Sequence, residues 1–304
     1  MAFNYDKIKA LLAIFLTTLI VGLSFVFVKM GLKYSTPVDL LADRLLVAFV
    51  VICLLRSFGA VKIGKIAKRQ KIGLLGLSFL YPTGFFALQI SGIEIIPATE
   101  ASIIYALLPI FTLIGSAILL KEKTSLLQKS GALLSVLGVL YITFQSSINI
   151  SMNYWGYFLI FSSLFAIVLY FILLKKTVQN VSIITVTFYI LMYGMLVVNL
   201  LNLFLTILTG SVSGFMERFY HAEYLYVVAY LGVLSTFLSS FLTNFSLKYL
   251  PASVVGVFNN FSPVIGLFAG VIILKETLFS YYIYGGVIVL IGLFMSSVKK
   301  ENGA

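Results

Sequence analysis

Ten long apolar runs follow one another along the chain, each bounded by charged or turn-forming residues. Each is close to the roughly 20 apolar residues that an α-helix needs to cross the hydrocarbon core of a bilayer. The pattern therefore predicts an all-α polytopic membrane protein with ten transmembrane helices and short connections. We expect the helices, to within about three residues, at 10–32, 39–58, 72–93, 97–120, 126–145, 155–174, 182–208, 223–247, 251–274 and 280–298.

The composition excludes an ordinary soluble protein. Of the 304 residues, 61% are hydrophobic and 10% are charged, and the mean hydropathy is +1.10. A soluble domain carries roughly 25% charged residues, so the charges here are too few to cover a water-facing surface. Cys53 is the single cysteine and His221 the single histidine. A zinc centre and Cys–His catalysis are therefore excluded, and we expect no cofactor and no enzymatic activity.

The basic residues predict the orientation of the chain. Of the 21 Lys and Arg residues, 16 fall in segments that lie on the same side of the membrane as both chain ends. Basic loops remain in the cytoplasm, so we expect a plasma-membrane protein with both termini cytoplasmic, which requires an even number of helices. The net charge of +11 is spread over these short loops, so we expect no nucleic-acid partner.

The chain contains an internal repeat. A shift of 154 residues aligns 97–138 with 251–292 without a gap, and we place one five-helix repeat at 1–147 and a second at 148–304. An odd number of helices forces the second copy to enter the membrane upside down, which is an architecture of secondary transporters. The matched residues include two prolines, a Lys-Glu pair and two glycines in each copy: Pro97, Pro109, Lys121, Glu122, Gly131 and Gly138 against Pro251, Pro263, Lys275, Glu276, Gly285 and Gly292.

With these repeated motifs, and with Arg44 followed by Ala48, the chain resembles the EamA-like members of the drug/metabolite transporter superfamily. The resemblance covers essentially the whole chain. It implies ten helices and the export of metabolites such as amino acids. It also suggests that the glycine-rich helices 126–145 and 280–298 form a packing scaffold, outside the transport path, that is a dimer face in some relatives. One departure is Val21, where such families often carry tryptophan.

Three prolines near span centres predict breaks in the helices. Pro82, Pro109 and Pro263 each free the carbonyl four residues earlier, and these carbonyls belong to Ser78, Tyr105 and Asn259. In hydrocarbon a freed carbonyl is tolerated where protein or a water-filled cavity satisfies it. The breaks therefore either line a binding cavity or only shape the packing.

Other polar residues within the spans are candidates for the same cavity. Asn259 and Asn260 are adjacent amides, and each needs a partner because burying an unpaired amide is costly. The hydroxyls and amides of the other spans either line a cavity or bond to neighbouring helices and their own carbonyls. The candidates on shared helix faces are Thr236 with Ser240 and Asn244, Ser163 with Tyr170, and Thr17 with Ser24.

Charges inside the predicted spans are few. Glu100 begins the helix 97–120, where it either binds a substrate ammonium or a proton or only complements the helix dipole in the first turn. Lys29 and Arg44 either pair with Asp39 or Asp43 or draw anions into the outer mouth. The two Lys-Glu pairs at helix ends are expected to anchor those ends by snorkelling.

These features predict a secondary transporter of small organic solutes. No Walker-type phosphate-binding loop is present, so ATP is not the direct energy source. The mostly neutral candidate groups suit an amphiphilic or zwitterionic solute such as an amino acid, and proton-coupled and facilitated cycles both remain open. The alternative is a multidrug or quaternary-ammonium exporter, because the span centres are rich in Tyr and Phe. Besides the solute, we expect lipid contacts and a monomer or homodimer.

Overall fold

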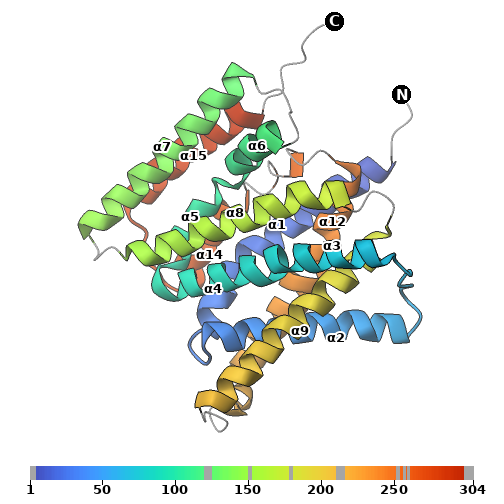
Figure 1. The fold of residues 1–304 in the computed structure, drawn as a ribbon. Coiled ribbons are helices and arrows are strands. Elements are labelled where there is room, and N and C mark those ends of the chain that lie inside the picture. The colour runs from blue at the N-terminus through green and yellow to red at the C-terminus, as the bar shows by residue number, and fades with distance from the viewer. Residues whose placement is uncertain are drawn as a thin grey trace, which may run out of the picture.

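The structure is a computed structural model. It describes residues 5–119, 125–149, 153–177, 181–209, 216–250, 254–255, 258 and 261–297. Throughout these ranges every regular element is a helix, as predicted (Figure 1).

The helices follow the predicted order. The first half contains α1 (Tyr5–Gly31), α2 (Pro37–Ser57), α3 (Lys68–Ser78), η1 (Phe79–Gly84), α4 (Phe85–Ile95), α5 (Ala98–Tyr105), α6 (Leu108–Leu119) and α7 (Leu126–Asn149). The second half contains α8 (Tyr154–Thr177), α9 (Ile183–Thr209), η2 (Arg218–Tyr220), α11 (Ala222–Ala229), η3 (Tyr230–Leu238), α12 (Ser239–Tyr249), α14 (Phe261–Ile273) and α15 (Ser280–Ser297). The helix predicted at 10–32 begins five residues early, at Tyr5, because a helix continues beyond its apolar run where Lys and Arg side chains reach the interface.

The outer surface of the helices is apolar. Five helical spans in the described part are long and apolar enough to cross a membrane: 6–31, 68–95, 154–174, 183–208 and 222–249. Leu12, Ile118 and Phe294 are each more than 60% exposed. Water would disfavour so wide an apolar surface, whereas lipid tails solvate it, and the fold is that of a polytopic membrane protein.

The repeat is visible in the positions of the helices. α4 and α12 begin and end 154 residues apart, and α7 and α15 also begin 154 residues apart. The irregular segment η1 corresponds at the same offset to residues 233–238, which lie inside η3. In the described part of the chain, η1, α4 and α7 therefore each have a counterpart at the same offset in the second half.

α7 and α15 show that the two copies are inverted. The two helices lie side by side (Figure 1), and three pairs of residues meet between them: Gly131 with Gly292, Ser135 with Val289, and Gly138 with Gly285. As the residue number rises along α7 it falls along α15, so these equivalent helices are antiparallel. Ser135 Oγ donates to the carbonyl of Val289, its own repeat equivalent, over 3.0 Å, as expected beside a two-fold axis.

Two of the three predicted proline breaks are confirmed. Tyr81, directly before Pro82, has extended backbone angles (φ −145°, ψ 127°) inside an otherwise helical span, as a residue before proline prefers. The span 97–120 divides into α5 and α6, and the amides of Ala106 and Leu107 turn to carbonyls three residues back, over 3.0 Å. Residues 256–257 and 259–260, where the Pro263 break is predicted, lie outside the described residues.

Candidate functional site

A cavity lies between the two repeats near the middle of the spans. Its volume is about 60 Å³, which is room for several water molecules. Helices of both repeats contribute to its wall, which consists of Thr17, Val21, Ser24, Tyr81, Phe85, Phe86, Gln89, Tyr105, Leu108, Ile167, Tyr170, Phe171, Ser235, Ser239, Thr243 and Ser262.

The wall combines large apolar surfaces with hydroxyl groups. The aromatic rings belong to η1, α4, α5 and α8, and the Ser and Thr hydroxyls belong to α1, η3, α12 and α14. Among the described residues that line the cavity, none carries a charge. Such a wall accommodates an apolar body and makes a few directed hydrogen bonds.

Four of the candidate residues named from the sequence line the cavity: Thr17, Ser24, Tyr105 and Tyr170. Two others lie directly behind the wall and hold the tyrosines. Ser163 Oγ is hydrogen-bonded to the Tyr105 hydroxyl, and Asn244 Oδ1 accepts from the Tyr170 hydroxyl over 2.8 Å. The predicted group therefore forms two layers, of which the outer one orients the inner one.

The polar stripe predicted on the helix 223–247 faces neighbouring helices. Thr236 Oγ1 accepts from Arg44 Nε over 3.0 Å, and Ser240 Oγ lies 3.0 Å from the Tyr81 hydroxyl oxygen. A one-residue step turns a side chain by about 100°, and the next stripe round the helix lines the cavity instead, with Ser235, Ser239 and Thr243.

Gln89 belongs to the wall and was not predicted. It is 1% exposed, and its Oε1 atom has no hydrogen-bond partner among the described residues. An amide inside the span 72–93 is as costly to bury as an asparagine, so Gln89 carried the same signal as Asn259 and Asn260. Those two asparagines lie outside the described residues. Ser78 is buried but does not line the cavity, and its Oγ donates to the carbonyl of Leu75 over 2.7 Å.

Glu100 lies away from the cavity and joins three helices. The carboxylate is 4% exposed. Oε2 accepts from the Tyr157 hydroxyl of α8 over 2.5 Å, and Oε1 accepts from the Tyr282 hydroxyl of α15 over 2.9 Å. These contacts tie the start of α5 to helices of the second repeat.

Glu276 also ties the repeats together at the start of α5. Its two carboxylate oxygens accept from the backbone amides of Ala98 and Thr99 over 3.1 and 3.0 Å, so it caps a helix of the other repeat. Snorkelling was expected for this residue, and the observed contact is more specific. The equivalent pair Lys121-Glu122 lies outside the described residues.

Lys29 pairs with backbone rather than with Asp39 or Asp43. Its Nζ donates to the carbonyls of Ile93, Ile96 and Glu94 over 2.6, 3.2 and 3.3 Å. These carbonyls end α4, where a cation is favourable against the helix dipole. Lys29 therefore joins α1 to α4.

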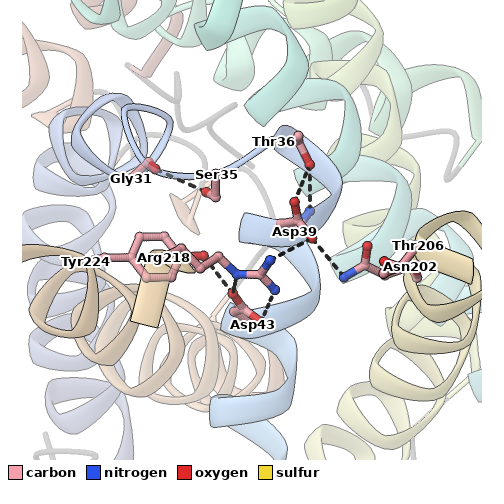
Figure 2. Close-up of polar contacts among 9 residues, drawn as sticks. All are labelled: Gly31, Ser35, Thr36, Asp39, Asp43, Asn202, Thr206, Arg218 and Tyr224. Atoms are coloured by element: carbon pink, nitrogen blue, oxygen red, sulfur yellow. Dashed lines mark hydrogen bonds and ion pairs between the residues drawn. The ribbon is translucent and has the colours of Figure 1, made fainter. Parts of the chain in front are cut away.

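Asp39 and Asp43 bind Arg218 (Figure 2). Arg218 Nη1 lies 3.0 Å from Asp39 Oδ1, and Nε lies 2.8 Å from Asp43 Oδ2, which also accepts from the Tyr224 hydroxyl over 2.6 Å. Burial lowers the pKa of Arg218, but the hydrogen bond to Asp43 and the charges of both aspartates outweigh it and raise the pKa above the ordinary value. Arg218 therefore remains charged and fixes η2 to α2.

Arg44 pairs with neither aspartate. Its side chain is completely buried, Nη2 donates to Ser235 Oγ over 3.1 Å, and the guanidinium carbon lies 3.6 Å from the centroid of the Phe86 ring. The adjacent Asp43 pairs with Arg218 instead. The two neighbouring charged residues of α2 therefore bind different partners.

Comparison with known proteins identifies the family. The sequence model of the EamA-like transporter family matches the chain twice, over residues 8–144 and 154–298. The chain belongs to the EamA-like transporter family. The predicted resemblance is thereby confirmed, and each match of the EamA-like model covers five of the predicted helices.

EamA-like relatives match along the whole chain. "Uncharacterized transporter YcxC" of Bacillus subtilis (strain 168) is 33% identical over 300 residues, which cover 98% of this chain and 96% of the relative. An "Uncharacterized transporter" of Archaeoglobus fulgidus is 27% identical over 293 residues, covering 96% of this chain and all of the relative. A crystal structure with 16% sequence identity superposes with a TM-score of 0.68 over 93% of this chain and 94% of its own, which supports the fold.

Proposed function

We propose that this EamA-like protein is a secondary transporter that moves a small organic metabolite, with amino acids as the leading class, by alternating access. The observation that carries the proposal is the cavity between two inverted repeats. Rocking inverted repeats against each other opens a shared site first to one side of the membrane and then to the other. We further propose export across the plasma membrane, with both termini in the cytoplasm, from the distribution of basic residues.

The wall of the cavity supports a solute with both apolar and polar parts. Phe85, Leu108 and Ile167 offer apolar contacts, and the hydroxyls of Ser24 and Tyr105 offer hydrogen bonds. A multiply charged phosphate would lack opposite charges among the described lining residues. The wall therefore favours a zwitterionic or neutral amphiphile over a multiply charged solute.

A quaternary-ammonium exporter is the alternative, favoured by the aromatic rings of the wall. Such a carrier would use Glu100 as the counter-ion, but Glu100 accepts from Tyr157 and Tyr282 and stands outside the wall. Glu100→Gln separates the two functions. A metabolite carrier keeps partial exchange of its solute, whereas a cation exporter that depends on this carboxylate loses transport.

Glu100 is also the residue we propose for proton coupling, if the cycle is coupled. Its bonds to two tyrosines join the repeats, so protonation would weaken a contact between them. Solute exchange that depends on an imposed pH gradient in the native protein, and loses that dependence in Glu100→Gln, supports coupling. Solute exchange that does not depend on the pH gradient indicates a facilitated cycle.

For the oligomeric state we propose either a monomer or a homodimer. In the homodimer, the lipid-facing side of α7 and α15 would form the dimer surface.

Counterflow in proteoliposomes tests the proposed function. Vesicles containing the full chain are preloaded with amino acids, nucleosides or cationic dyes, and uptake of the labelled solute is followed. Accelerated exchange of amino acids supports the proposal, and equal leakage of every solute contradicts it. Tyr105→Phe should raise KM because it removes a hydroxyl of the wall. Tyr284→Phe, the same change at an exposed position on α15, should leave KM unchanged.

A further inference from the structure

Arg44 is a buried cation whose hydrogen-bonding capacity is not filled. A guanidinium carries five N–H donors and no acceptor. In the described structure Nε donates to Thr236 Oγ1 and Nη2 donates to Ser235 Oγ, while Nη1 is buried and has no partner. Buried donors are nearly always paired in folded proteins, so a missing partner calls for an explanation.

Arg44 also has no counter-ion among the described residues. The ion pairs of Asp39 and Asp43, the acidic residues nearest to it on α2, are both made with Arg218. The two neutral hydroxyls and the Phe86 ring that surround the guanidinium disperse its charge without neutralising it. A buried charge without an opposite charge is strongly unfavourable, and within a membrane it marks a functional site by default.

The guanidinium stands one side chain behind the cavity wall. Ser235, which accepts from Nη2, and Phe86, whose ring lies under the guanidinium carbon at 3.6 Å, both line the cavity. The guanidinium therefore contacts two side chains of the wall, and its charge acts across them on whatever occupies the cavity. To bind a solute directly, the guanidinium requires a rotamer change of one of these two side chains.

An unfilled acceptor lies in the same wall. Gln89 Oε1 is buried without a partner among the described residues, and Gln89 lies three residues after Phe86 on α4, so both face the same side of the helix. The cavity thus lacks a donor at Gln89 and an acceptor at Arg44. A solute that carries both a donor and an acceptor would pair with both groups.

We propose that Arg44 is the anion-binding residue of the cavity, where it holds the carboxylate of the transported solute while a donor group of the same solute, such as an ammonium, binds Gln89 Oε1. The inference rests on the proposed function and narrows it to solutes with a carboxylate. Arg44 suits this role because a guanidinium binds a carboxylate through two parallel hydrogen bonds. The Phe86 ring keeps the guanidinium plane in place from one side.

The experiment is counterflow of the full chain in proteoliposomes with matched solutes. L-leucine is compared with L-leucinamide, which lacks the carboxylate, and with 4-methylpentanoate, which lacks the ammonium. Every amino acid of the wider panel is likewise compared with its amide. We expect the acid to be exchanged about tenfold to a hundredfold better than the amide, as for the loss of a charge-assisted hydrogen bond.

Variants assign the selectivity to Arg44. Arg44→Gln should remove the preference for acid over amide, and Arg44→Lys should retain part of it, because the charge stays while the paired geometry is lost. Arg56→Gln is the matched control: it makes the same change of charge at an exposed position on the same helix, and it should keep the preference. Ser235→Ala changes the wall beside the guanidinium while the charge stays, and it should reduce the preference without abolishing it.

The outcomes separate the two proposals. No exchange of any solute by the wild-type protein contradicts the proposed function itself. Exchange of acids and amides at equal rates, or exchange of dyes or nucleosides alone, overturns the role of Arg44 and leaves the transporter in place. The role of Arg44 is also overturned if the wild-type protein prefers acids and Arg44→Gln keeps the same preference. If Arg44→Gln does not fold, the comparison of acids with amides in the wild-type protein still tests the proposal.

Discussion

Replacing Gly292 by alanine tests the antiparallel packing of α7 against α15. The added Cβ atom would lie 2.4 Å from Ser135 Oγ, 2.5 Å from the carbonyl oxygen of Gly131 and 2.6 Å from the amide nitrogen of Ser135. Two of these three atoms belong to the backbone of α7, so a rotamer change cannot relieve the contacts. The two helices must move apart by a large part of 1 Å.

The size of the effect follows from two opposing contributions. Overpacking a well-packed site costs about 1–3 kcal/mol, whereas alanine is favoured over glycine in a helix by about 1 kcal/mol. Gly292→Ala should therefore lower the free energy of unfolding by up to about 2 kcal/mol. Gly286→Ala on the same helix meets nothing within 4 Å, so only the favourable helix contribution remains and the stability should rise slightly.

Unfolding in mixed detergent micelles measures both variants against the native protein. The two alanine variants should differ by about 2 kcal/mol, which is more than tenfold in the unfolding equilibrium constant. Equal stabilities, or a less stable Gly286→Ala, would refute the close approach of α7 and α15. Since that approach is the evidence for inversion, the two-fold arrangement would be refuted with it.

Three further predictions concern contacts near the ends of the helices. Asp43→Asn removes one partner of the buried Arg218 pair and should lower stability by about 3 kcal/mol, measured by unfolding in micelles; no loss would contradict the pairing. Glu276→Ala uncaps α5 and should lower stability by about 1–2 kcal/mol, with faster amide exchange at the start of α5 as the local readout. The hydrogen bond to Glu223 raises the pKa of Tyr34. The bond is therefore intact below the ordinary tyrosine pKa of about 10 and is lost as the pH rises through the raised pKa. Ultraviolet titration should show a lower pKa of Tyr34 in Glu223→Gln, and an unchanged pKa would contradict the bond.

The helices and the repeat were predictable because they depend on local and periodic properties. Apolar length sets the spans, and proline determines the breaks before Pro82 and Pro109. The irregular segment η3 has no proline in its sequence, so the corresponding break in the second repeat could not be predicted from local sequence.

The choice of cavity-lining residues depended on contacts that the sequence does not display. The stripe of Thr236 and the stripe of Ser235 have the same spacing and similar chemistry. Arg44, which is distant in sequence, bonds to both hydroxyls, and the cavity lies on the Ser235 side. The sequence predicted Arg44 near an outer helix end and left open whether it pairs with Asp43. In the structure Asp43 pairs with Arg218, which is far away in the sequence, so Asp43 is not the partner of Arg44.

Thiol labelling of the cavity from each side of the membrane tests alternating access most directly. Ser239→Cys, in a background where Cys53 is replaced by alanine, places one reactive group in the wall. A membrane-impermeant reagent should modify it from the inside and from the outside in separate experiments, and a transported solute should slow both reactions. Modification from one side alone, unchanged by any solute that the protein exchanges, would contradict a cavity that the two repeats open in turn.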